Sequence, residues 1–345
     1  LNISYRLAAD TNWAPAGHEI ASGQFLLPAK EKIEVETSLP SMPICCEDMK
    51  NKLKITGADF EIIFDKISGR IDSWKFAGLT FMHKGPALNF WRAPIDNDMF
   101  EVEKWKAKNL NHLIDTVDEI RWHKFGEDTL NISVNGKVAP ITLDWSIKYK
   151  LLYTINGSGN VILEISGNPE GRGLPETLPR IGVQAELAKN LERVRWWGRG
   201  PGESYIDSKQ ANSFGLYTKH IDELYTPYIK PQENGNRTEV KWVSFEEPVG
   251  IGFIIAGEEP LNFSAHRFSI KSIENAKNRC NLVSEDKIYL KLDYRHHGLG
   301  SASCGPGQLP QYKLVPASFR FKLCMKPFYP DEVSAKNLSK LKILG

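Results

Sequence analysis

Apolar and polar residues alternate along most of this chain in short runs, and each run ends near a glycine, proline or asparagine. Alternation with a period of two residues is typical of strands with one buried face, and runs of about 5–10 residues are too short for helices of several turns. The pattern therefore predicts an all-β protein, with well over ten strands and two short helices, arranged as a large twisted β-sandwich.

Turn chemistry predicts three hairpins, which join residues 60–64 to 70–76, 129–134 to 137–143, and 151–155 to 161–165. The second of these turns contains Asn135-Gly136, the strongest short-range hairpin signal, because both residues tolerate positive φ. Further strands are predicted over residues 180–187, 193–197, 239–245, 250–256, 287–294 and 319–325. Helices are predicted over residues 102–113 and 330–341.

The first residues behave differently from the rest of the chain. Residues 1–30 contain two strand-like runs with nothing to pack against, and a two-stranded ribbon alone is marginally stable in water. We therefore expect residues 1–30 to be the end of a preceding β-domain. Residues 31–50, with their prolines and the adjacent cysteines Cys45 and Cys46, are expected to form a linker, and residues 51–345 the main domain.

Composition excludes several classes of protein. The 345 residues include 44 Lys and Arg against 42 Asp and Glu, a net charge of +2, which lacks the basic excess of a nucleic-acid binder. No run approaches the ~18 apolar residues of a membrane span. The five cysteines show no CxxC spacing, so neither a disulfide framework nor a structural zinc site is expected.

Three segments concentrate polar side chains that are candidates for catalysis or ligand binding. In the first, residues 91–100, the turn after Pro94 carries Asp96, Asn97 and Asp98. Such side chains cap the backbone N–H groups of a turn, and they also accept hydrogen bonds from sugar hydroxyls. Composition favours the turn-stabilising role but leaves both open.

The second segment combines flat aromatic faces with bidentate polar groups, as carbohydrate sites do. It runs over residues 196–217 and 225–242 and contains Trp196, Trp197, Glu203, Asp207, Glu233, Asn234 and Arg237. The structural alternative is a buried aromatic layer in which Arg237 pairs with Glu203 or Glu233.

The third segment, residues 292–312, places adjacent His296 and His297 at the end of a strand before a loop rich in glycine, serine and proline. One imidazole can act on a substrate while the other faces the core, although either can be purely structural. No GxSxG, P-loop, GxGxxG or HExxH motif occurs in a usable context, which removes the usual support for nucleotide binding and serine-hydrolase chemistry.

Four blocks within these segments closely resemble the C-terminal region, or small chain, of the β-galactosidases of glycoside hydrolase family 2. They are WRAPIDND (91–98), WWGRGPGESYIDSK (196–209), LYTPYIKPQENGNRTEVKW (224–242) and LDYRHHGLGSASCGPGQLPQY (292–312). The resemblance extends over residues 51–326. It implies a galactose-mutarotase-like antiparallel β-supersandwich, preceded over residues 1–30 by the last strands of an immunoglobulin-like domain.

The resemblance also implies that the chain is the non-catalytic part of a retaining enzyme that hydrolyses terminal β-D-galactosides. Such an enzyme uses two glutamates with carboxyl groups ~5–5.5 Å apart. In the family they lie on a (β/α)₈ barrel, together with a magnesium site, and this sequence has no alternating βα pattern. We therefore expect no catalytic residue, metal or other cofactor in this chain, and no activity from it alone.

The partners that the resemblance implies are the catalytic barrel, in the same chain or as a large subunit, a β-galactoside, and a second copy in a homo-oligomer. The chain would wall the substrate cleft and contribute to assembly. The candidate substrate-binding residues are Arg92, Asp96, Asn97, Asp98, Glu233, Asn234, Arg237, His266, His296, His297, Ser303 and Cys304.

One position departs from the family. Where some members place a tryptophan against the sugar, this sequence has Cys304, preceded by Ser303. Loss of the stacking face puts a lactose preference in doubt and makes a longer or differently decorated β-galactoside conceivable.

Two alternative functions remain open. One is a free-standing aldose 1-epimerase, in which Arg92, Glu233, His266 and His296 supply the acid and base. The other is a carbohydrate-binding module with Trp196 and Trp197 as the platform, which requires these rings to be exposed.

Overall fold

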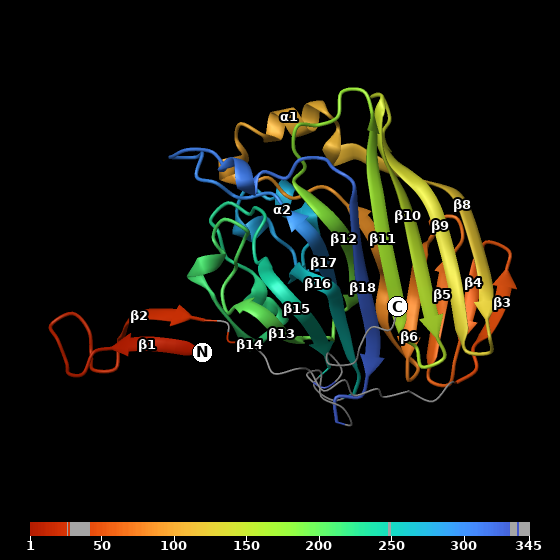
Figure 1. The fold of residues 1–345 in the computed structure, drawn as a ribbon, viewed down its shortest axis with the longest axis horizontal. Helices are drawn as coiled ribbons and strands as arrows, with labels where there is room; N and C mark the ends of the chain where they lie inside the picture. Colours follow the sequence, from red (N-terminus) through yellow and green to blue (C-terminus); the bar gives the residue numbers. More distant parts are fainter. Residues whose placement is uncertain (26, 28–41, 248–249, 332–336, 338–345) are drawn as a thin grey trace. The chain divides into compact units, whose positions relative to one another are not determined.

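The computed structural model describes residues 1–25, 27, 42–247, 250–331 and 337. Most of the predicted helix over 330–341 and most of the predicted linker over 31–50 lie outside these residues. The chain divides into two compact units, residues 1–37 and 38–345. In the first unit, β1 (Asn2–Arg6) and β2 (Glu19–Gln24) form an antiparallel ribbon in which Asn2 lies opposite Gln24 (Figure 1).

The second unit is built on one antiparallel sheet with 16 strands in its described part. The strands are β3 (Cys45–Met49), β4 (Lys52–Thr56), β5 (Phe60–Asp65), β6 (Arg70–Phe76), β7 (Leu79–Asn89), β8 (Leu113–Phe125), β9 (Thr129–Pro140), β10 (Trp145–Asn156), β11 (Val161–Gly171), β12 (Arg180–Ala188), β13 (Arg193–Gly200), β14 (Ser213–His220), β15 (Arg237–Glu246), β16 (Gly252–His266), β17 (Lys287–His296) and β18 (Phe319–Phe328). The all-β prediction is confirmed. Residues 45–49, within the expected linker, form β3.

The sheet curls so that its two ends face each other across a core. Its main path runs β3-β4-β5-β6-β7-β12-β17-β16-β18-β11-β10-β9-β8, with β13, β14 and β15 branching from β16. Phe64 of β5 packs edge-to-face on Tyr153 of β10, with ring centroids 5.2 Å apart, and Arg70 of β6 pairs with Asp115 of β8. In Figure 1 the yellow-green strands β8–β11 accordingly lie across from the orange strands β3–β6.

Alternation along the strands explains how this core is filled. In β10 every second residue is buried, and these residues are Trp145, Ile147, Tyr149, Leu151, Tyr153 and Ile155. Each large apolar side chain buried in this way contributes about 1.5–3 kcal/mol relative to an exposed one. The period-two pattern thus places one face of each strand inside the sandwich and leaves the other to solvent.

Two of the three predicted hairpins are confirmed, namely β5–β6 and β10–β11. The hairpin at Asn135-Gly136 is wrong, because β9 continues without a turn through both residues and pairs with β8 on one side and β10 on the other. Gly136 has another use here. A Cβ atom at this position would lie 2.5 Å from the Tyr149 hydroxyl and from the Thr116 carbonyl oxygen, so the glycine permits close strand packing.

The predicted helix over 102–113 is too long. Helix α1 spans only Val102–Ala107, and Asn109, with φ of 55°, reverses the chain before β8 begins at Leu113. A second helix, α2 (Ile270–Asn275), is capped by Ser269 and was not predicted. Short 3₁₀ turns complete the helical structure: η1 (Asp96–Asp98), η2 (Leu110–His112), η3 (Lys209–Ala211), η4 (Ile221–Leu224), η5 (Arg279–Asn281) and η6 (Pro310–Tyr312).

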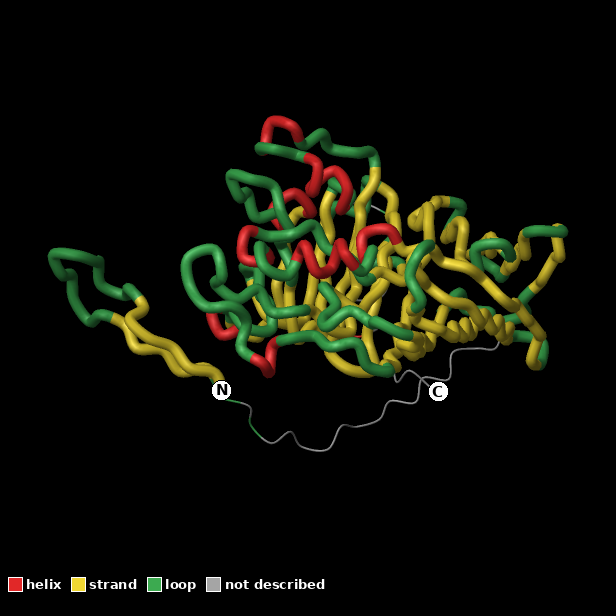
Figure 2. Tube along the Cα trace, turned by 90° about the horizontal axis from the view of Figure 1, so that it is seen from above, coloured by secondary structure: helices red, strands yellow, loops and turns green. Residues whose placement is uncertain are grey.

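The helical turns gather at one end of the large unit, whereas the other end consists of strands and their turns (Figure 2). Strands β7, β12 and β17 are neighbours, and in their ladders Asn89 lies opposite Gly182 and Arg180 opposite His296. The loops after β7 and β17 therefore start side by side. No helix among the described residues is long and apolar enough to cross a membrane.

Candidate functional site

The three polar segments found in the sequence meet at this loop-bearing end. The Asn97 amide donates to the Gly300 carbonyl at 2.8 Å, and its oxygen accepts the Ser303 N–H at 3.1 Å and the Ser303 hydroxyl at 2.5 Å. Asp96 accepts a 3.1 Å bond from the Gln232 amide and pairs with Lys230. Residues more than 200 positions apart thus form one ledge.

Beneath this ledge, Arg92 and Asp98 form a fully buried ion pair. Two guanidinium nitrogens donate to the two carboxylate oxygens of Asp98 at 3.1 and 2.6 Å, and both side chains have 0% exposure. Asp98 also accepts the Ile95 N–H, and Arg92 donates to the carbonyl oxygen of His297 at 2.9 Å. Because their partners saturate them, these two residues support the loops rather than present themselves to a ligand.

A second buried centre surrounds Arg180, which the sequence analysis missed. One of its terminal nitrogens lies 2.7 Å from Asp293, 3.1 Å from Nε2 of His296 and 3.4 Å from Glu233. Arg180 begins β12 and Asp293 lies within β17, and both strands carry further charged residues, such as Glu186 and Lys291, so no local signal in the sequence singles these two out. The centre brings together Glu233 and His296, as predicted candidates, with two unpredicted charges.

Burial changes the protonation of this centre. It raises the pKa of Asp293 to about 6, although the Arg180 charge opposes the shift. Burial, together with the positive charges of Arg180 and Arg92, holds the pKa of His296 well below its ordinary value. His296 is therefore neutral. An arginine faces each of its ring nitrogens: Nε2 lies 3.1 Å from Arg180, and Nδ1 lies 3.1 Å from both Arg92 and the carbonyl oxygen of His297.

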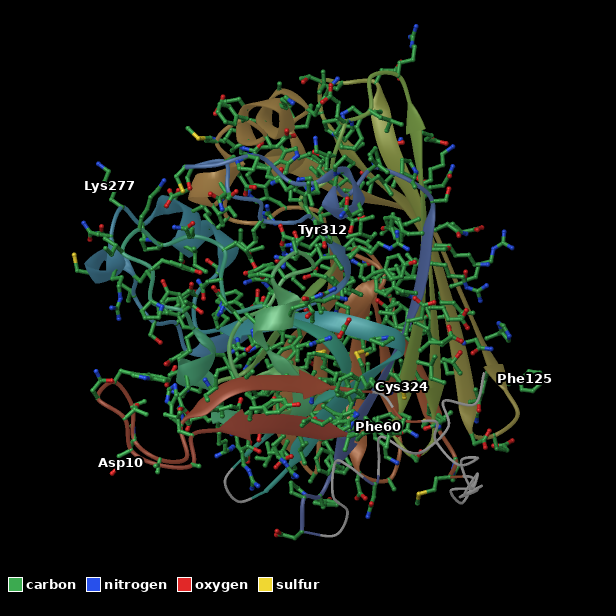
Figure 3. The ribbon with its side chains drawn as sticks, turned by 60° about the vertical axis from the view of Figure 1, so that its left-hand side comes forward. Asp10, Phe60, Phe125, Lys277, Tyr312 and Cys324 are labelled. Carbon is green, nitrogen blue, oxygen red and sulfur yellow. The ribbon has the colours of Figure 1, made fainter. Side chains whose placement is uncertain are left out.

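The two adjacent histidines, His296 and His297, have different surroundings. His296 lines a cavity of about 410 Å³ together with residues such as Lys209, Asn262 and Tyr312. Tyr312 is labelled in Figure 3. His297 faces the core, where its Nδ1 accepts the Leu314 N–H and its ring meets Trp105 edge-to-face. Burial lowers the pKa of His297 to about 3.

Asn234 and Arg237 bind backbone groups and do not face open space. Asn234 bridges the Thr226 N–H and the Gln232 carbonyl. Arg237 donates to the carbonyl oxygens of Leu224 and Gly235, and burial lowers its pKa to about 10. The alternative in which Arg237 pairs with Glu203 or Glu233 is wrong, because backbone carbonyls occupy its terminal nitrogens and no ion pair joins it to a carboxylate among the described residues.

The two tryptophans also differ in environment. Trp196 is fully buried, between the rings of Tyr217 and Phe263. Trp197 is 37% exposed and meets Phe214 edge-to-face. A carbohydrate platform would therefore rest on one half-exposed ring instead of two.

The remaining candidate substrate-binding residues differ in their exposure to solvent. Asp96, Ser303 and Cys304 are exposed, and Asn97 is half-buried. His266 is buried in a different cavity from His296, so the four residues of the epimerase alternative do not line one cavity. Among the described residues, no group of three or more His, Cys, Asp or Glu side chains is placed to hold a metal ion.

The fold and this loop-built end define an antiparallel β-supersandwich with a polar ledge over a buried charge cluster. The family model of the β-galactosidase small chain matches residues 56–325, and the model of β-galactosidase domain 4 matches residues 1–28. The chain belongs to the β-galactosidase small chain family.

Known β-galactosidases match most of this chain. That of Kluyveromyces lactis is 32% identical over 323 residues, which cover 92% of this chain and 31% of the relative. That of Priestia megaterium is 29% identical over 306 residues, which cover 87% and 28%. The chain thus spans about 30% of the length of these relatives.

Solved structures with a similar fold include a galactose 1-epimerase from Lactobacillus acidophilus, with 10% identity and a TM-score of 0.42 over 84% of this chain and 98% of that one. An α-mannosidase from Enterococcus faecalis has 9% identity and a TM-score of 0.47 over 87% of this chain and 32% of that one. Similarities this distant carry no functional conclusion.

Proposed function

We propose that this chain walls the substrate cleft of a retaining β-galactosidase of glycoside hydrolase family 2 and helps to assemble it. A separate catalytic barrel would supply the two glutamates and the magnesium ion. The match to β-galactosidases over about 30% of their length supports a protein with a further large part. The substrate would be a terminal β-D-galactoside.

One observation carries the proposal, namely the pair of hydrogen-bonded loops at Asn97 and Ser303. The Asn97 side chain fixes the position of residues 300–303, so that Asp96, Ser303 and Cys304 stand exposed on one ledge. Polar groups that a rigid scaffold presents at the surface are suited to contact sugar hydroxyls. Cys304 offers no flat face, which favours substrates whose aglycone needs no stacking.

The same ledge has an apolar margin suited to a partner. Met99 and Phe100 are 51% and 65% exposed, and they follow the ledge residues directly in the chain. Exposed apolar side chains next to polar loops mark interaction surfaces. We assign this margin to contact with the catalytic barrel.

The buried carboxylates argue against hydrolysis by this chain alone. Glu233 and Asp293 are 3% and 0% exposed and both lie against Arg180. A retaining glycosidase needs two carboxyl groups that reach the anomeric carbon. Groups committed to a buried arginine do not meet this requirement.

Complementation tests the proposed function. Hydrolysis of a chromogenic β-galactoside is measured for this chain, for the catalytic portion that lacks it, and for their mixture. We expect activity only in the mixture. Activity of this chain alone, or a mixture no more active than the catalytic portion, would contradict the proposal.

Loop variants sharpen this experiment. Replacement Asn97→Ala releases the ledge and should reduce kcat/KM of the mixture by about tenfold, the effect of a hydrogen bond that positions a binding group. Asn168→Ala, at an exposed position of β11, is the matched control. Equal activities of the two mixtures would exclude the loops from the cleft.

The aldose 1-epimerase alternative retains one supporting observation. His296 and Glu233 approach to 4.0 Å, and His296 lines the larger cavity. A base that takes the proton of the anomeric hydroxyl and an acid that protonates the ring oxygen as the C1–O5 bond breaks would permit ring opening. Polarimetry of galactose with this chain tests it, and an uncatalysed rate of mutarotation would eliminate this activity.

A further inference from the structure

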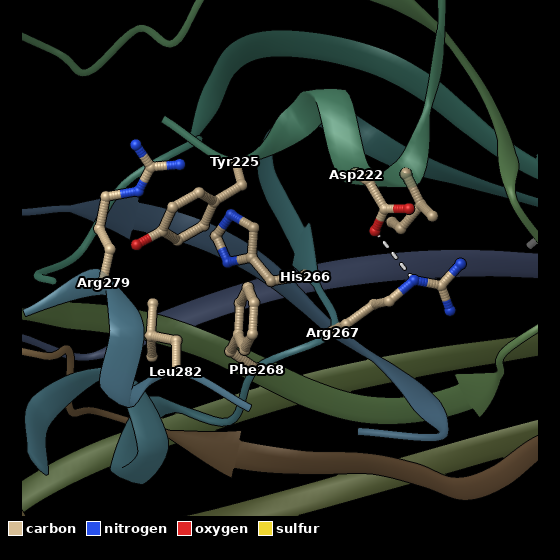
Figure 4. Close-up of a pocket in the computed structure, with 8 residues that line it drawn as sticks. Asp222, Tyr225, His266, Arg267, Phe268, Arg279 and Leu282 are labelled. Carbon is tan, nitrogen blue, oxygen red and sulfur yellow. Dashed lines mark hydrogen bonds and ion pairs between the residues drawn. The ribbon is translucent and has the colours of Figure 1, made fainter. Parts of the chain in front are cut away.

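A second cavity lies apart from the ledge and from the cavity at His296. Its volume is about 210 Å³, and it is enclosed by η4, the end of β16 and the segment around η5 (Figure 4). Its lining residues are Ile221, Asp222, Tyr225, His266, Arg267, Phe268, Arg279 and Leu282. The volume is below the ~300–1,000 Å³ of sites for drug-sized ligands, so only a small ligand fits.

Two polar groups in this cavity lack partners. His266 is 2% exposed, and neither of its ring nitrogens has a hydrogen-bond partner among the described residues. The hydroxyl of Tyr225 is buried and equally unpartnered within that part of the chain. Buried polar groups are nearly always hydrogen-bonded, so two such groups lining one cavity indicate a missing partner.

One guanidinium at this cavity, that of Arg279, has no carboxylate partner among the described residues. Asp222 accepts from Arg267 at 2.9 Å, and Arg267 also bonds Glu192 at 2.6 Å, so the charge of Arg267 is fully paired. Arg279 makes no ion pair with any described carboxylate, and its charge acts on the Tyr225 phenol. Arg279 is exposed, so its guanidinium is free to bind an anionic group that enters the cavity.

The rest of the wall is apolar and flat. The Tyr225 ring contacts the rings of both His266 and Phe268, and Leu282 completes this side (Figure 4). The ring contacts are edge-to-face, with centroids 5.6 and 5.4 Å apart. Burial and the charges of Lys291 and Arg237 hold the pKa of His266 well below its ordinary value, so its imidazole is neutral and offers one donor and one acceptor.

From this combination we propose that the cavity binds a monosaccharide that carries a negative charge, as a phosphate or a carboxylate. Arg279 binds the charged group, Tyr225 and His266 bind hydroxyls, and the C–H face of the sugar packs on Phe268 and Leu282. A neutral sugar leaves the guanidinium unpaired, and inorganic phosphate alone leaves the apolar wall uncovered. The site is independent of the proposed role in galactoside hydrolysis.

Isothermal titration of the 345-residue chain tests this site. The probes are galactose 6-phosphate, galacturonate, galactose and inorganic phosphate. We expect saturable binding of at least one charged sugar, at least about tenfold tighter than that of galactose or phosphate. The two charged probes distinguish a phosphate ligand from a carboxylate ligand.

Two variants locate the binding. Arg279→Gln should weaken binding of the charged sugar at least about tenfold, and Tyr225→Phe several-fold. Arg295→Gln is the matched control, since Arg295 is an exposed arginine in the wall of the other cavity. Urea unfolding of each variant verifies that the fold is retained.

Three results would overturn the proposal. The first is that neither charged sugar binds. The second is that galactose or inorganic phosphate binds as tightly as the charged sugar, which would leave a general sugar site or an adventitious ion only. The third is that Arg279→Gln and Arg295→Gln reduce affinity equally, since the charge would then act from elsewhere.

Discussion

At the scale of single residues, Asp98 and Asp96 are neighbours with opposite roles. Asp98 neutralises the buried guanidinium of Arg92, whereas Asp96 is exposed and pairs with Lys230. Removal of one member of a buried pair leaves an uncompensated charge, so Asp98→Ala should lower the free energy of unfolding by about 3–5 kcal/mol. Urea denaturation measures this change. The control Asp96→Ala should unfold like the wild type, and equal losses in both variants would contradict the structural role of Asp98.

The pH dependence of stability follows from the buried histidines. The pKa of His297 is about 3 in the folded chain against an ordinary value of 6.5, so below pH 6.5 the unfolded state binds more protons. The contribution of His297 to the free energy of unfolding is complete above pH 6.5 and is lost as the pH falls toward 3. Between pH 6.5 and pH 5, protonation of this residue in the unfolded state lowers the free energy of unfolding by about 2 kcal/mol.

His266 and His296, whose pKa values are also lowered, act in the same direction. Asp293, with a pKa raised to about 6, acts in the opposite one, because its contribution is lost as the pH rises toward 6. Urea midpoints between pH 5 and 7 should fall with decreasing pH. The slope should be smaller in His297→Asn, whose amide oxygen can still accept the Leu314 N–H, and an unchanged slope would show that His297 does not titrate.

The sequence predicted those site residues that lie in locally polar runs. The run from Asp96 to Asp98 stood out in the sequence, but its division into an exposed and a buried carboxylate depends on Arg92, whose position only the fold determines. Arg180 and Asp293 went unnoticed because both strands contain other charged residues and because the contact between the two spans 113 positions.

At the scale of elements, the turn at Asn135-Gly136 shows where local signals fail. The dipeptide favours a hairpin, yet β9 pairs along its whole length with β8 and β10, and these two ladders outweigh the preference of one turn. The hairpins β5–β6 and β10–β11 were predictable because their turns separate strands that pair with each other.

Gly136 is required in β9 for packing rather than for turning. Gly136→Ala should therefore lower the free energy of unfolding by about 1–3 kcal/mol, because the new Cβ would meet Tyr149 and Thr116. Gly307→Ala is the control, since a Cβ there has no neighbour within 4 Å and its φ is not positive. Chemical denaturation of both variants measures the difference. A Gly136→Ala variant as stable as the control would show that close packing does not require glycine at this position.

At the scale of the whole molecule, alternation in the sequence sufficed to predict an all-β sandwich, but not the curl that brings β5 against β10. That closure depends on contacts between residues such as Phe64 and Tyr153, 89 positions apart, which leave no periodic trace. Its consequence is that the loops after β7 and β17 share one end, and this end carries both the ledge and the apolar margin at Met99 and Phe100.

Mutation can test the role of this margin in binding without a change in the stability of the fold. Met99 and Phe100 are exposed, so the double variant Met99→Ser, Phe100→Ser should keep the urea midpoint of the parent chain. Loss of two apolar anchors should nevertheless weaken association with the catalytic portion at least about tenfold, measured as the chain concentration that gives half-maximal complementation. The control is Phe125→Ser, 70% exposed at the tip of β8 (Figure 3). If both variants complement at the same concentration, the catalytic barrel does not bind at Met99 and Phe100. This contact would then not be what places the ledge at Asn97 in the cleft.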